Sequence, residues 1–440
     1  MYLERNIDHE LRSWKEETGR KPLLIRGARQ VGKSSSVRKL GESFELFLEI
    51  NFEEHKDAIS LFQGDLTPQV LCENLSVMFD TAIVPGKTLL FFDEIQACLP
   101  AISSLRFFYE KMPELHVIAA GSLLEFALKD IASFGVGRVR SAYMFPLSFD
   151  EFLIGTGQTK LLKLKSKAGP QNPLSSVFHE KLLDLLKKFL ILGGMPEVVK
   201  KYVSENDIRK CQRILDDLIS SFRTDFSKYK ERIPASRIRE VFEAVVLQAG
   251  GKFVYKKASQ DLNTRQIKEA LELLIMSGLV FPVTHTSANG IPMGAEIDPK
   301  KRKMLLLDTG IFQRLLKLNI SDLIFSADFS LVNKGGIAEQ FLGLEIVKCA
   351  SCYEQTDLYY WHREALNSNA EVDYLIQKNG EIVPIEVKSG TKGSMKSMHL
   401  FLQEKNQNFG CRFSLENFAE YNKIKVFPLY AYKNMAQITL

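Results

Sequence analysis

The stretch from Gly27 to Ser34 has the composition of a phosphate-binding loop. It reads Gly-Ala-Arg-Gln-Val-Gly-Lys-Ser, fits G-x-x-x-x-G-K-[ST], and directly follows the apolar run 23–25. Such a loop works where a buried strand ends and a helix begins, because backbone N–H groups and the positive helix terminus then converge on an anion. We predict that Lys33 reaches the β- and γ-phosphates of a nucleotide and that the Ser34 hydroxyl ligates Mg²⁺. The predicted nucleotide-binding residues are Gly27, Ala28, Arg29, Gln30, Val31, Gly32, Lys33, Ser34 and Ser35.

Two carboxylates, Asp93 and Glu94, close the apolar run 88–92. This pattern indicates a parallel strand buried on both faces, and open α/β sheets bind ligands at the carboxyl ends of their strands. Asp93 can then hold the Mg²⁺ shell, while Glu94 polarises the attacking water. Taken alone, an acidic pair at a strand end is usually a solvated turn. Together with the loop, the pair favours ATP hydrolysis over passive binding.

Two further residues are candidates for contact with the γ-phosphate. The strand predicted over 116–120 ends at Gly121-Ser122, which places the Ser122 hydroxyl where a γ-phosphate or lytic water is sensed. An N-cap serine for a helix over 123–128 is an equally good interpretation. Arg138 can serve a nucleotide bound by the same chain or by a neighbouring subunit. A solvated arginine is the alternative.

A second acidic constellation lies in the C-terminal part of the chain. Asn379-Gly380 separates the extended runs 371–377 and 381–387, and Asn-Gly is the strongest short signal for a two-residue hairpin loop. The resulting register places Asp373 directly opposite Glu386. Opposed carboxylates repel each other at this distance, so we expect a cation, Mg²⁺ or Mn²⁺, between them.

The same register brings Glu371 opposite Lys388, on the face that carries Asp373 and Glu386. Lys388 is placed to orient water or offset phosphate charge, and Glu339 can turn inward from an upstream helix toward the same metal. The set Glu339, Asp373 and Glu386-x-Lys388 resembles the PD-(D/E)xK nuclease core of restriction-endonuclease-like folds. A Glu371–Lys388 salt bridge beside a solvated Asp373 is the structural alternative.

Length and composition set broad limits. A chain of 440 residues should form about three domains or more, and 45% hydrophobic with 25% charged residues is ordinary for a globular protein. The net charge of +5 and pI of 8.6 tilt the protein toward nucleic acid without requiring it. Without a signal peptide or an apolar run of roughly 20 residues, we expect a cytoplasmic protein with no membrane partner. Six scattered cysteines predict reduced thiols.

The segments that connect these sites differ in the spacing of their apolar residues. Short apolar strands alternate with helical patterns up to residue 155, which indicates a parallel sheet covered on both faces. Residues 155–173 are expected to form a loop, and 174–230 to be helical. Helices predicted over 236–249 and 264–276, followed by a hairpin, suggest a winged helix. Its candidate DNA-binding residues are Lys256, Arg265 and Lys268. Winged helices also serve as protein-contact modules.

The set of motifs resembles one known family. Its ATPase part is carried by residues 27–34, 92–96, 120–122, 137–138, 146–152 and 193–197, and its C-terminal part by residues 307–310, 371–373 and 385–388. In these segments the chain is similar to prokaryotic AAA-type P-loop ATPases with a C-terminal domain of unknown function. The resemblance and the pattern of the segments together predict an α/β architecture with four parts: an AAA-type core (1–160), a helical lid (161–230), a winged-helix-like module (231–310) and a restriction-endonuclease-like PD-(D/E)xK domain (311–440).

These observations predict a Mg²⁺-dependent ATP-binding and ATP-hydrolysing protein that acts on DNA, with ATP, DNA and further copies of itself as partners. Two other functions stay open. One is an ATP-controlled DNA- or protein-binding switch whose C-terminal domain never cuts. The other is a metal-dependent nuclease gated by nucleotide.

Overall fold

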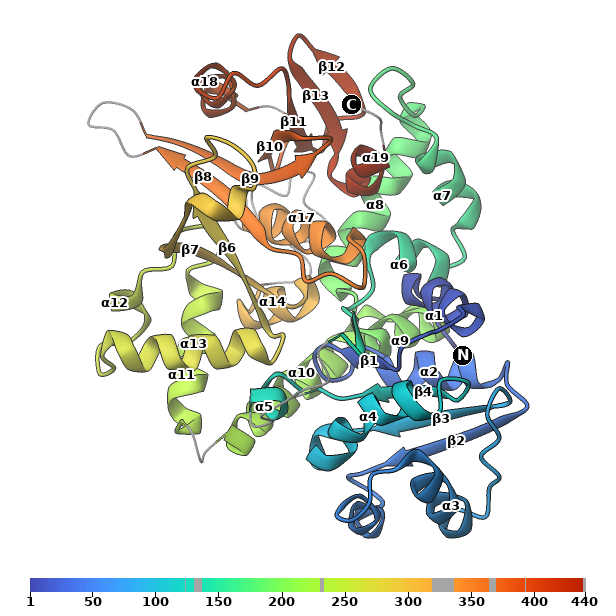
Figure 1. The fold of residues 1–440 in the computed structure, drawn as a ribbon. Coiled ribbons are helices and arrows are strands. Elements are labelled where there is room, and N and C mark those ends of the chain that lie inside the picture. Colours follow the sequence, from blue (N-terminus) through green and yellow to red (C-terminus); the bar gives the residue numbers. More distant parts are fainter. Residues whose placement is uncertain are drawn as a thin grey trace. The chain divides into compact units, whose positions relative to one another are not determined.

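A computed structural model describes residues 1–122, 124–129, 137–229, 233–318, 336–363, 369–391 and 393–437 (Figure 1). The chain divides into two compact units. Unit 1 comprises residues 1–145, 276–278 and 351–355, and unit 2 comprises residues 146–275, 279–350 and 356–440. No helix within the described ranges is long and apolar enough to cross a membrane. All six cysteines are free thiols.

Unit 1 is built on a five-stranded parallel sheet in the order β2-β3-β4-β1-β5. Its strands are β1 (Leu23–Arg26), β2 (Leu46–Asn51), β3 (Thr88–Asp93), β4 (His116–Ala120) and β5 (Arg140–Tyr143). Its helices are α1 (Asn6–Glu16), α2 (Lys33–Gly41), α3 (Pro68–Met78), α4 (Leu99–Lys111) and α5 (Leu124–Lys129), with the 3-10 turns η1 (Lys56–Phe62) and η2 (Ile95–Ala97). Every residue of β3 and β4 is buried. The predicted α/β core with a parallel sheet is therefore confirmed.

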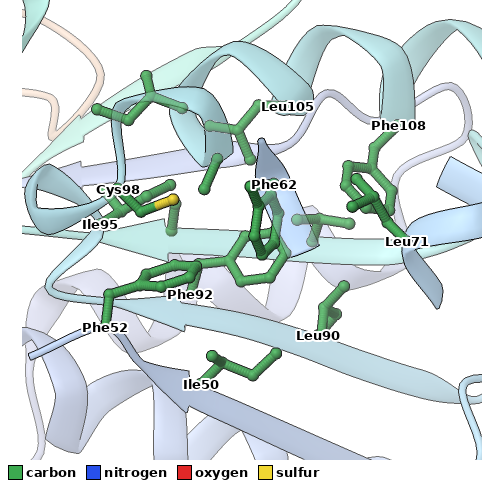
Figure 2. Close-up of a cluster of buried hydrophobic side chains, with 14 of the residues drawn as sticks. Ile50, Phe52, Phe62, Leu71, Leu90, Phe92, Ile95, Cys98, Leu105 and Phe108 are labelled. Atoms are coloured by element: carbon green, nitrogen blue, oxygen red, sulfur yellow. The ribbon is translucent and has the colours of Figure 1, made fainter. Parts of the chain in front are cut away.

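An aromatic cluster fixes the orientation of β3 (Figure 2). The ring of Phe92 lies 5.6 Å from the ring of Phe62 and 5.7 Å from that of Phe52, measured between centroids. Successive side chains of a strand point to opposite faces. Burying Phe92 in this cluster therefore directs the next side chain, Asp93, away from it and toward helix α2.

Unit 2 contains an eight-stranded mixed sheet in the order β12-β13-β11-β10-β9-β8-β6-β7. Its strands are β6 (Val280–Thr286), β7 (Ile297–Leu306), β8 (Leu358–Arg363), β9 (Ala370–Lys378), β10 (Glu381–Val387), β11 (Gly410–Ser414), β12 (Ala419–Tyr421) and β13 (Ile424–Pro428). Strand β6 pairs in parallel with β8. Strands from both sides of the boundary predicted at residue 310 therefore share one sheet.

The β9–β10 hairpin has the predicted register. Asn379 and Gly380 have φ values of 51° and 82°, as a type I′ loop requires. Lys378 pairs with Glu381, and the pairing continues to Tyr374 opposite Ile385. The short Asn-Gly signal was sufficient because loop length sets the register of a hairpin.

The helices of unit 2 include one in a segment that the sequence predicted to be a loop. They are α6 (Phe149–Gly155), α7 (Thr159–Ser166), α8 (Ser176–Leu192), α9 (Pro196–Glu205), α10 (Ile208–Asp225), α11 (Ala235–Leu247), α12 (Tyr255–Ala258), α13 (Thr264–Met276), α14 (Thr309–Leu315), α17 (Gly336–Cys349), α18 (Lys396–Glu404) and α19 (Tyr432–Gln437), with the 3-10 turns η3 (Phe226–Tyr229), η4 (Met293–Glu296) and η5 (Leu429–Ala431). Helix α7 lies where a loop was expected. Its Lys165 is buried and forms a 2.6 Å ion pair with Asp150, so a residue that suggested solvent exposure is part of the interior.

Two glycine-containing motifs, residues 193–197 and 307–310, meet around one buried carboxylate, and a third motif, residues 146–152, contacts the first of them. Asp308 accepts hydrogen bonds from the backbone N–H groups of Gly310 (2.9 Å), Ile311 (3.1 Å) and Gly194 (2.6 Å). The N–H of Leu147 in turn donates to the Gly194 carbonyl at 2.7 Å. A Cβ atom on Gly194 would lie 2.2 Å from the Leu147 carbonyl oxygen. These motifs therefore join helices α6, α8 and α14 within unit 2.

We expect Gly194→Ala to destabilise the protein by about 1–3 kcal/mol, because the added methyl group would clash with the backbone carbonyl of Leu147. Gly290→Ala is the matched control in the same unit, since a Cβ there meets nothing within 4 Å. Thermal unfolding checks both variants. Equal melting temperatures for the two would contradict the close approach of residues 147 and 194.

Candidate functional site

The loop between β1 and α2 has the backbone of a phosphate cradle. Gly27, Gln30 and Gly32 have φ values of 142°, 64° and 103°, in the range that favours glycine. A Cβ atom on Gly27 would lie 2.1 Å from the Met144 carbonyl oxygen. Helix α2 begins at Lys33, and the first N–H groups of a helix have no intrahelical partners. The predicted residues 27–35 therefore form one loop and helix start, as an anion site requires.

Lys33 points back into this loop. Its ammonium donates to the carbonyl oxygens of Gly27 at 3.0 Å and Ala28 at 2.9 Å. Burial lowers the pKa of Lys33 to about 8, although the nearby Glu94 and Asp93 carboxylates favour the charged form. A bound polyphosphate would give this ammonium a stronger partner than the two carbonyls.

The two predicted Mg²⁺ ligands contact each other. The Ser34 hydroxyl donates to Asp93 Oδ2 at 2.8 Å, which joins the first turn of α2 to the end of β3. Burial raises the pKa of Asp93, while the Ser34 hydrogen bond opposes the shift. A hydroxyl and a carboxylate are the hard oxygen ligands that Mg²⁺ takes beside nucleotide phosphates. The residues present therefore fit a nucleotide-bound Mg²⁺.

Glu94 follows Asp93 in a left-handed conformation, with φ 48° and ψ 43°. Such a conformation is costly for a residue with a side chain and is found preferentially at functional sites. The Gln96 amide donates to Glu94 Oε2 and thereby fixes the carboxylate. Gln96 belongs to the motif at residues 92–96, but the sequence did not predict its hydrogen bond to Glu94.

Ser122 lies at the same edge of the sheet. Arg29 Nε donates to its hydroxyl at 3.3 Å, so the loop and the end of β4 are in direct contact. Ser122 is buried. The helix predicted over 123–128 begins outside the described residues at position 123, and α5 covers Leu124–Lys129.

Arg138 is not brought to the loop. Leu23 at the start of β1 pairs with Arg140 at the start of β5, so Arg138 precedes the amino ends of the strands, whereas the loop follows their carboxyl ends. Its guanidinium pairs with Glu110 at 2.9 Å. This position does not support contact with a nucleotide bound in the loop of the same chain. A nucleotide of a neighbouring subunit and a solvated arginine both stay open as predictions.

The amino-terminal residues contact the phosphate-cradle loop and helix α2, and the sequence did not predict these contacts. Arg5 is buried and donates to the carbonyl oxygens of Val31 at 2.9 Å and Phe145 at 2.6 Å. Tyr2 Oη lies 3.0 Å from Ser36 Oγ in helix α2. The segment before α1 therefore holds the loop from outside, and no motif marks it.

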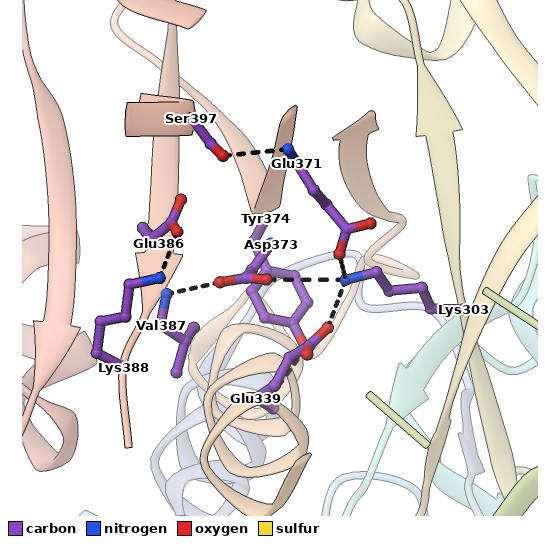
Figure 3. Close-up of polar contacts among 9 residues, drawn as sticks. All are labelled: Lys303, Glu339, Glu371, Asp373, Tyr374, Glu386, Val387, Lys388 and Ser397. Carbon is purple, nitrogen blue, oxygen red and sulfur yellow. Dashed lines mark hydrogen bonds and ion pairs between the residues drawn. The ribbon is translucent and has the colours of Figure 1, made fainter. Parts of the chain in front are cut away.

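The C-terminal carboxylates meet a lysine where a metal ion was expected (Figure 3). Glu339 turns inward from α17 as predicted, but its Oε1 accepts from Lys303 Nζ at 2.8 Å. The same ammonium lies 2.5 Å from Glu371 Oε1 and 3.7 Å from Asp373 Oδ1. Among the described side chains, no group of three or more potential ligands is arranged to hold a metal ion. The described residues therefore do not support the predicted metal site of Glu339, Asp373 and Glu386.

The physical reason is that lysines supply the positive charge that opposed carboxylates require. Lys388 Nζ bonds Glu386 Oε1 at 2.6 Å, while Asp373 Oδ2 accepts from the Val387 N–H at 2.7 Å. Burial raises the pKa values of Asp373 and Glu386. The alternative Glu371–Lys388 salt bridge is not formed either, since each residue pairs elsewhere.

The three predicted DNA-binding residues are exposed on unit 2. Arg265 has a side chain 88% exposed and pairs with Glu269 at 2.9 Å. The Lys268 ammonium lies 5.7 Å from the ring centroid of Tyr255, which brings α13 beside α12 and its exposed Lys256. These positive groups share their surface with Glu269, so their charge is partly neutralised.

Three parts of the chain match known family models. Residues 19–153 match an AAA domain. Residues 183–322 and 334–432 match two domains of unknown function, DUF8612 and DUF4143. The chain therefore carries an AAA-type ATPase-like domain followed by regions whose families have no described function, and no curated protein matches it.

The solved structures that resemble this chain include three that share little sequence identity with it. The Walker-type ATPase PABY2304 of Pyrococcus abyssi is 15% identical, with a TM-score of 0.47, 72% of this chain and 96% of that chain covered. Replication initiator DnaA bound to AMPPCP and single-stranded DNA is 11% identical, with a TM-score of 0.30 and coverages of 62% and 85%. C. elegans PCH-2 is 11% identical, with a TM-score of 0.27 and coverages of 47% and 63%. Each TM-score is below 0.5, so none of these likenesses carries an argument about this chain.

We expect ATP turnover to depend on the protonation of Lys33. Its lowered pKa of about 8 means that the free protein loses this positive charge as the pH rises through that value. Because kcat/KM reports groups of the free enzyme, it should fall above about pH 8. Bound phosphates stabilise the ammonium, so kcat should hold to higher pH. Steady-state kinetics from pH 6 to 10 measure both, and a kcat/KM flat across pH 8 to 9.5 would contradict this role.

Proposed function

We propose that this protein binds ATP with Mg²⁺ and hydrolyses the terminal phosphoanhydride. The observation that carries the proposal is the 2.8 Å hydrogen bond between Ser34 and Asp93, formed beside a loop with the backbone of a phosphate cradle. It joins the two metal-ligating positions that phosphoryl transfer uses. The AAA domain match over residues 19–153 supports the same function.

Each residue of the site has a distinct part in this proposal. The N–H groups at the start of α2 and the Lys33 ammonium bind the phosphates. Ser34 and Asp93 would hold Mg²⁺, which neutralises charge that develops on the phosphate oxygens. Glu94 orients and deprotonates the attacking water. Ser122, held by Arg29, is placed to contact the terminal phosphate or the water.

Replacing Lys33 and Glu94 should separate binding from chemistry. Lys33→Ala removes the cation that grips the phosphates and should weaken ATP binding. Glu94→Gln keeps the shape and should lower kcat by about 10²-fold or more while ATP still binds, because only the water-activating group changes. Fluorescent-nucleotide titration and phosphate release measure the two effects. Lys39→Ala is the control, since this lysine is exposed on the same helix.

The control variant should match the natural protein in both assays. A wild-type hydrolysis rate in Glu94→Gln would remove Glu94 from the proposed mechanism. Unchanged ATP affinity in Lys33→Ala would remove the loop from the site.

DNA is the partner that we propose for unit 2. The order α11, a bridge between Lys252 and Lys303, α12, α13 and the β6–β7 hairpin is the order expected of a winged helix. In that arrangement the amino-terminal end of α13 enters a groove. Its exposed Arg265 and Lys268, with Lys256 from α12, support DNA contact.

Neutralising Lys256, Arg265 and Lys268 to Ala should reduce the salt dependence of DNA binding. The slope of log affinity against log salt should fall by roughly one unit for each lost phosphate contact. A triple variant of Lys160, Lys181 and Lys188 is the matched control, because these lysines are exposed on α7 and α8. Fluorescence anisotropy with a duplex at several salt concentrations measures the slopes. Equal slopes in the two triple variants would favour a protein-contact role instead.

A further inference from the structure

The acidic centre of the C-terminal sheet already contains a cation that belongs to the chain. The Lys303 ammonium approaches from β7 and lies among carboxylates from three directions, with Glu371 and Asp373 on β9 and Glu339 on α17 (Figure 3). The Lys303 side chain is only 1% exposed. This lysine is therefore an interior residue, and water supplies little of its solvation.

The surroundings of Lys303 hold its ammonium in place. Nζ lies 5.2 Å from the ring centroid of Tyr360 on β8, a distance at which an aromatic face attracts a cation. The backbone is fixed on both sides, because Lys303 pairs with Val283 of β6 and bridges Lys252. Movement of the ammonium out of the centre would require the lysine side chain to cross a packed interior.

A divalent ion and this ammonium compete for the same carboxylates. Oxygen ligands bind Mg²⁺ at about 2.0–2.1 Å, and Glu339 and Glu371 present their oxygens to Nζ at 2.8 Å and 2.5 Å. An ion that used both side chains would lie almost on the ammonium nitrogen. Like charges repel strongly at such a distance in a poorly solvated interior.

The acidic groups in this centre outnumber its basic groups. Four carboxylates face two ammonium groups, because Glu386 joins the centre with Lys388 as its partner. Glu386 Oε2 is buried and has no hydrogen-bond partner among the residues that the structure describes. The centre thus holds more carboxyl groups than ammonium groups, and removing an ammonium would leave oxygen ligands for a further cation.

We propose that Lys303 is a built-in counter-cation that keeps divalent metal out of this centre, and that removing its ammonium converts Glu339, Glu371 and Asp373 into a divalent-metal site. In the natural protein, this centre then holds no divalent metal and supports no metal-dependent cleavage. This inference does not depend on ATP hydrolysis, because every residue in it belongs to unit 2.

Titration with Mn²⁺ tests the proposal on the full chain. An Asp93→Asn background without nucleotide removes the metal ligand of the ATP site. In this background, Lys303→Met should bind Mn²⁺ at one site per chain, with a Kd at least tenfold lower than that of the protein that keeps Lys303. Electron paramagnetic resonance of free Mn²⁺ measures the binding. Lys300→Met is the matched control, because it removes an exposed positive charge from the same strand and should gain nothing.

Two further variants keep the test decisive. Glu371→Gln with Lys303→Met removes one acid together with the base, and it serves if Lys303→Met alone folds poorly. Mn²⁺ should raise its melting temperature, and adding Asp373→Asn should abolish both that rise and the binding. The proposal is overturned if the protein with Lys303 binds Mn²⁺ equally well through Asp373, if neither Lys303 variant gains a site, or if Asp373-dependent DNA cleavage occurs in the natural protein with Mn²⁺.

Discussion

A buried carboxylate is costly unless hydrogen bonds or a cation compensate it, and both units of this protein are organised around that requirement. In unit 1, Asp93 is compensated by the Ser34 hydroxyl, which ties the end of β3 to the start of α2. In unit 2, Asp308 accepts three backbone N–H groups and thereby joins α8 to α14. The same requirement has opposite consequences, because Asp93 lies beside a loop that can admit a nucleotide and Asp308 lies in a closed interior.

Two buried lysines, Lys33 and Lys303, differ in how easily a ligand could replace the groups that they contact. Lys33 bonds two neutral carbonyl oxygens, and burial lowers its pKa to about 8. A triphosphate offers far stronger compensation than those carbonyls do. Lys303 contacts three carboxylates, and their charge raises its pKa despite burial. Lys33 is therefore available to a ligand, whereas Lys303 is fully occupied by its own chain.

Short sequence motifs correctly predicted those features that depend only on neighbouring residues in the chain. The pattern from Gly27 to Ser34 dictates a loop and a helix start, and Asn379-Gly380 dictated the register of a hairpin. Lys303 could not be predicted in this way, because it reaches Glu339 only through the packing of β7 against α17, 36 positions along the chain. Arg5 was missed for the same reason. The reading of residues 155–173 as a loop failed because Lys165 is neutralised by Asp150 inside the protein, a pairing that composition does not reveal.

The motifs of the C-terminal half divide into two physical classes, and this division limits what a resemblance can imply. Gly193, Gly194 and Asp308 are required by close backbone approach and by the hydrogen bonds of one buried acid, so the fold alone accounts for them. Asp373 and Glu386-x-Lys388 match a metal-dependent pattern in type and spacing. A metal centre nevertheless depends on net charge at one point in space, and Lys303 changes that charge from outside the motif. A nuclease-like pattern can therefore persist in an interior where a lysine of the same chain is the cation that the carboxylates contact.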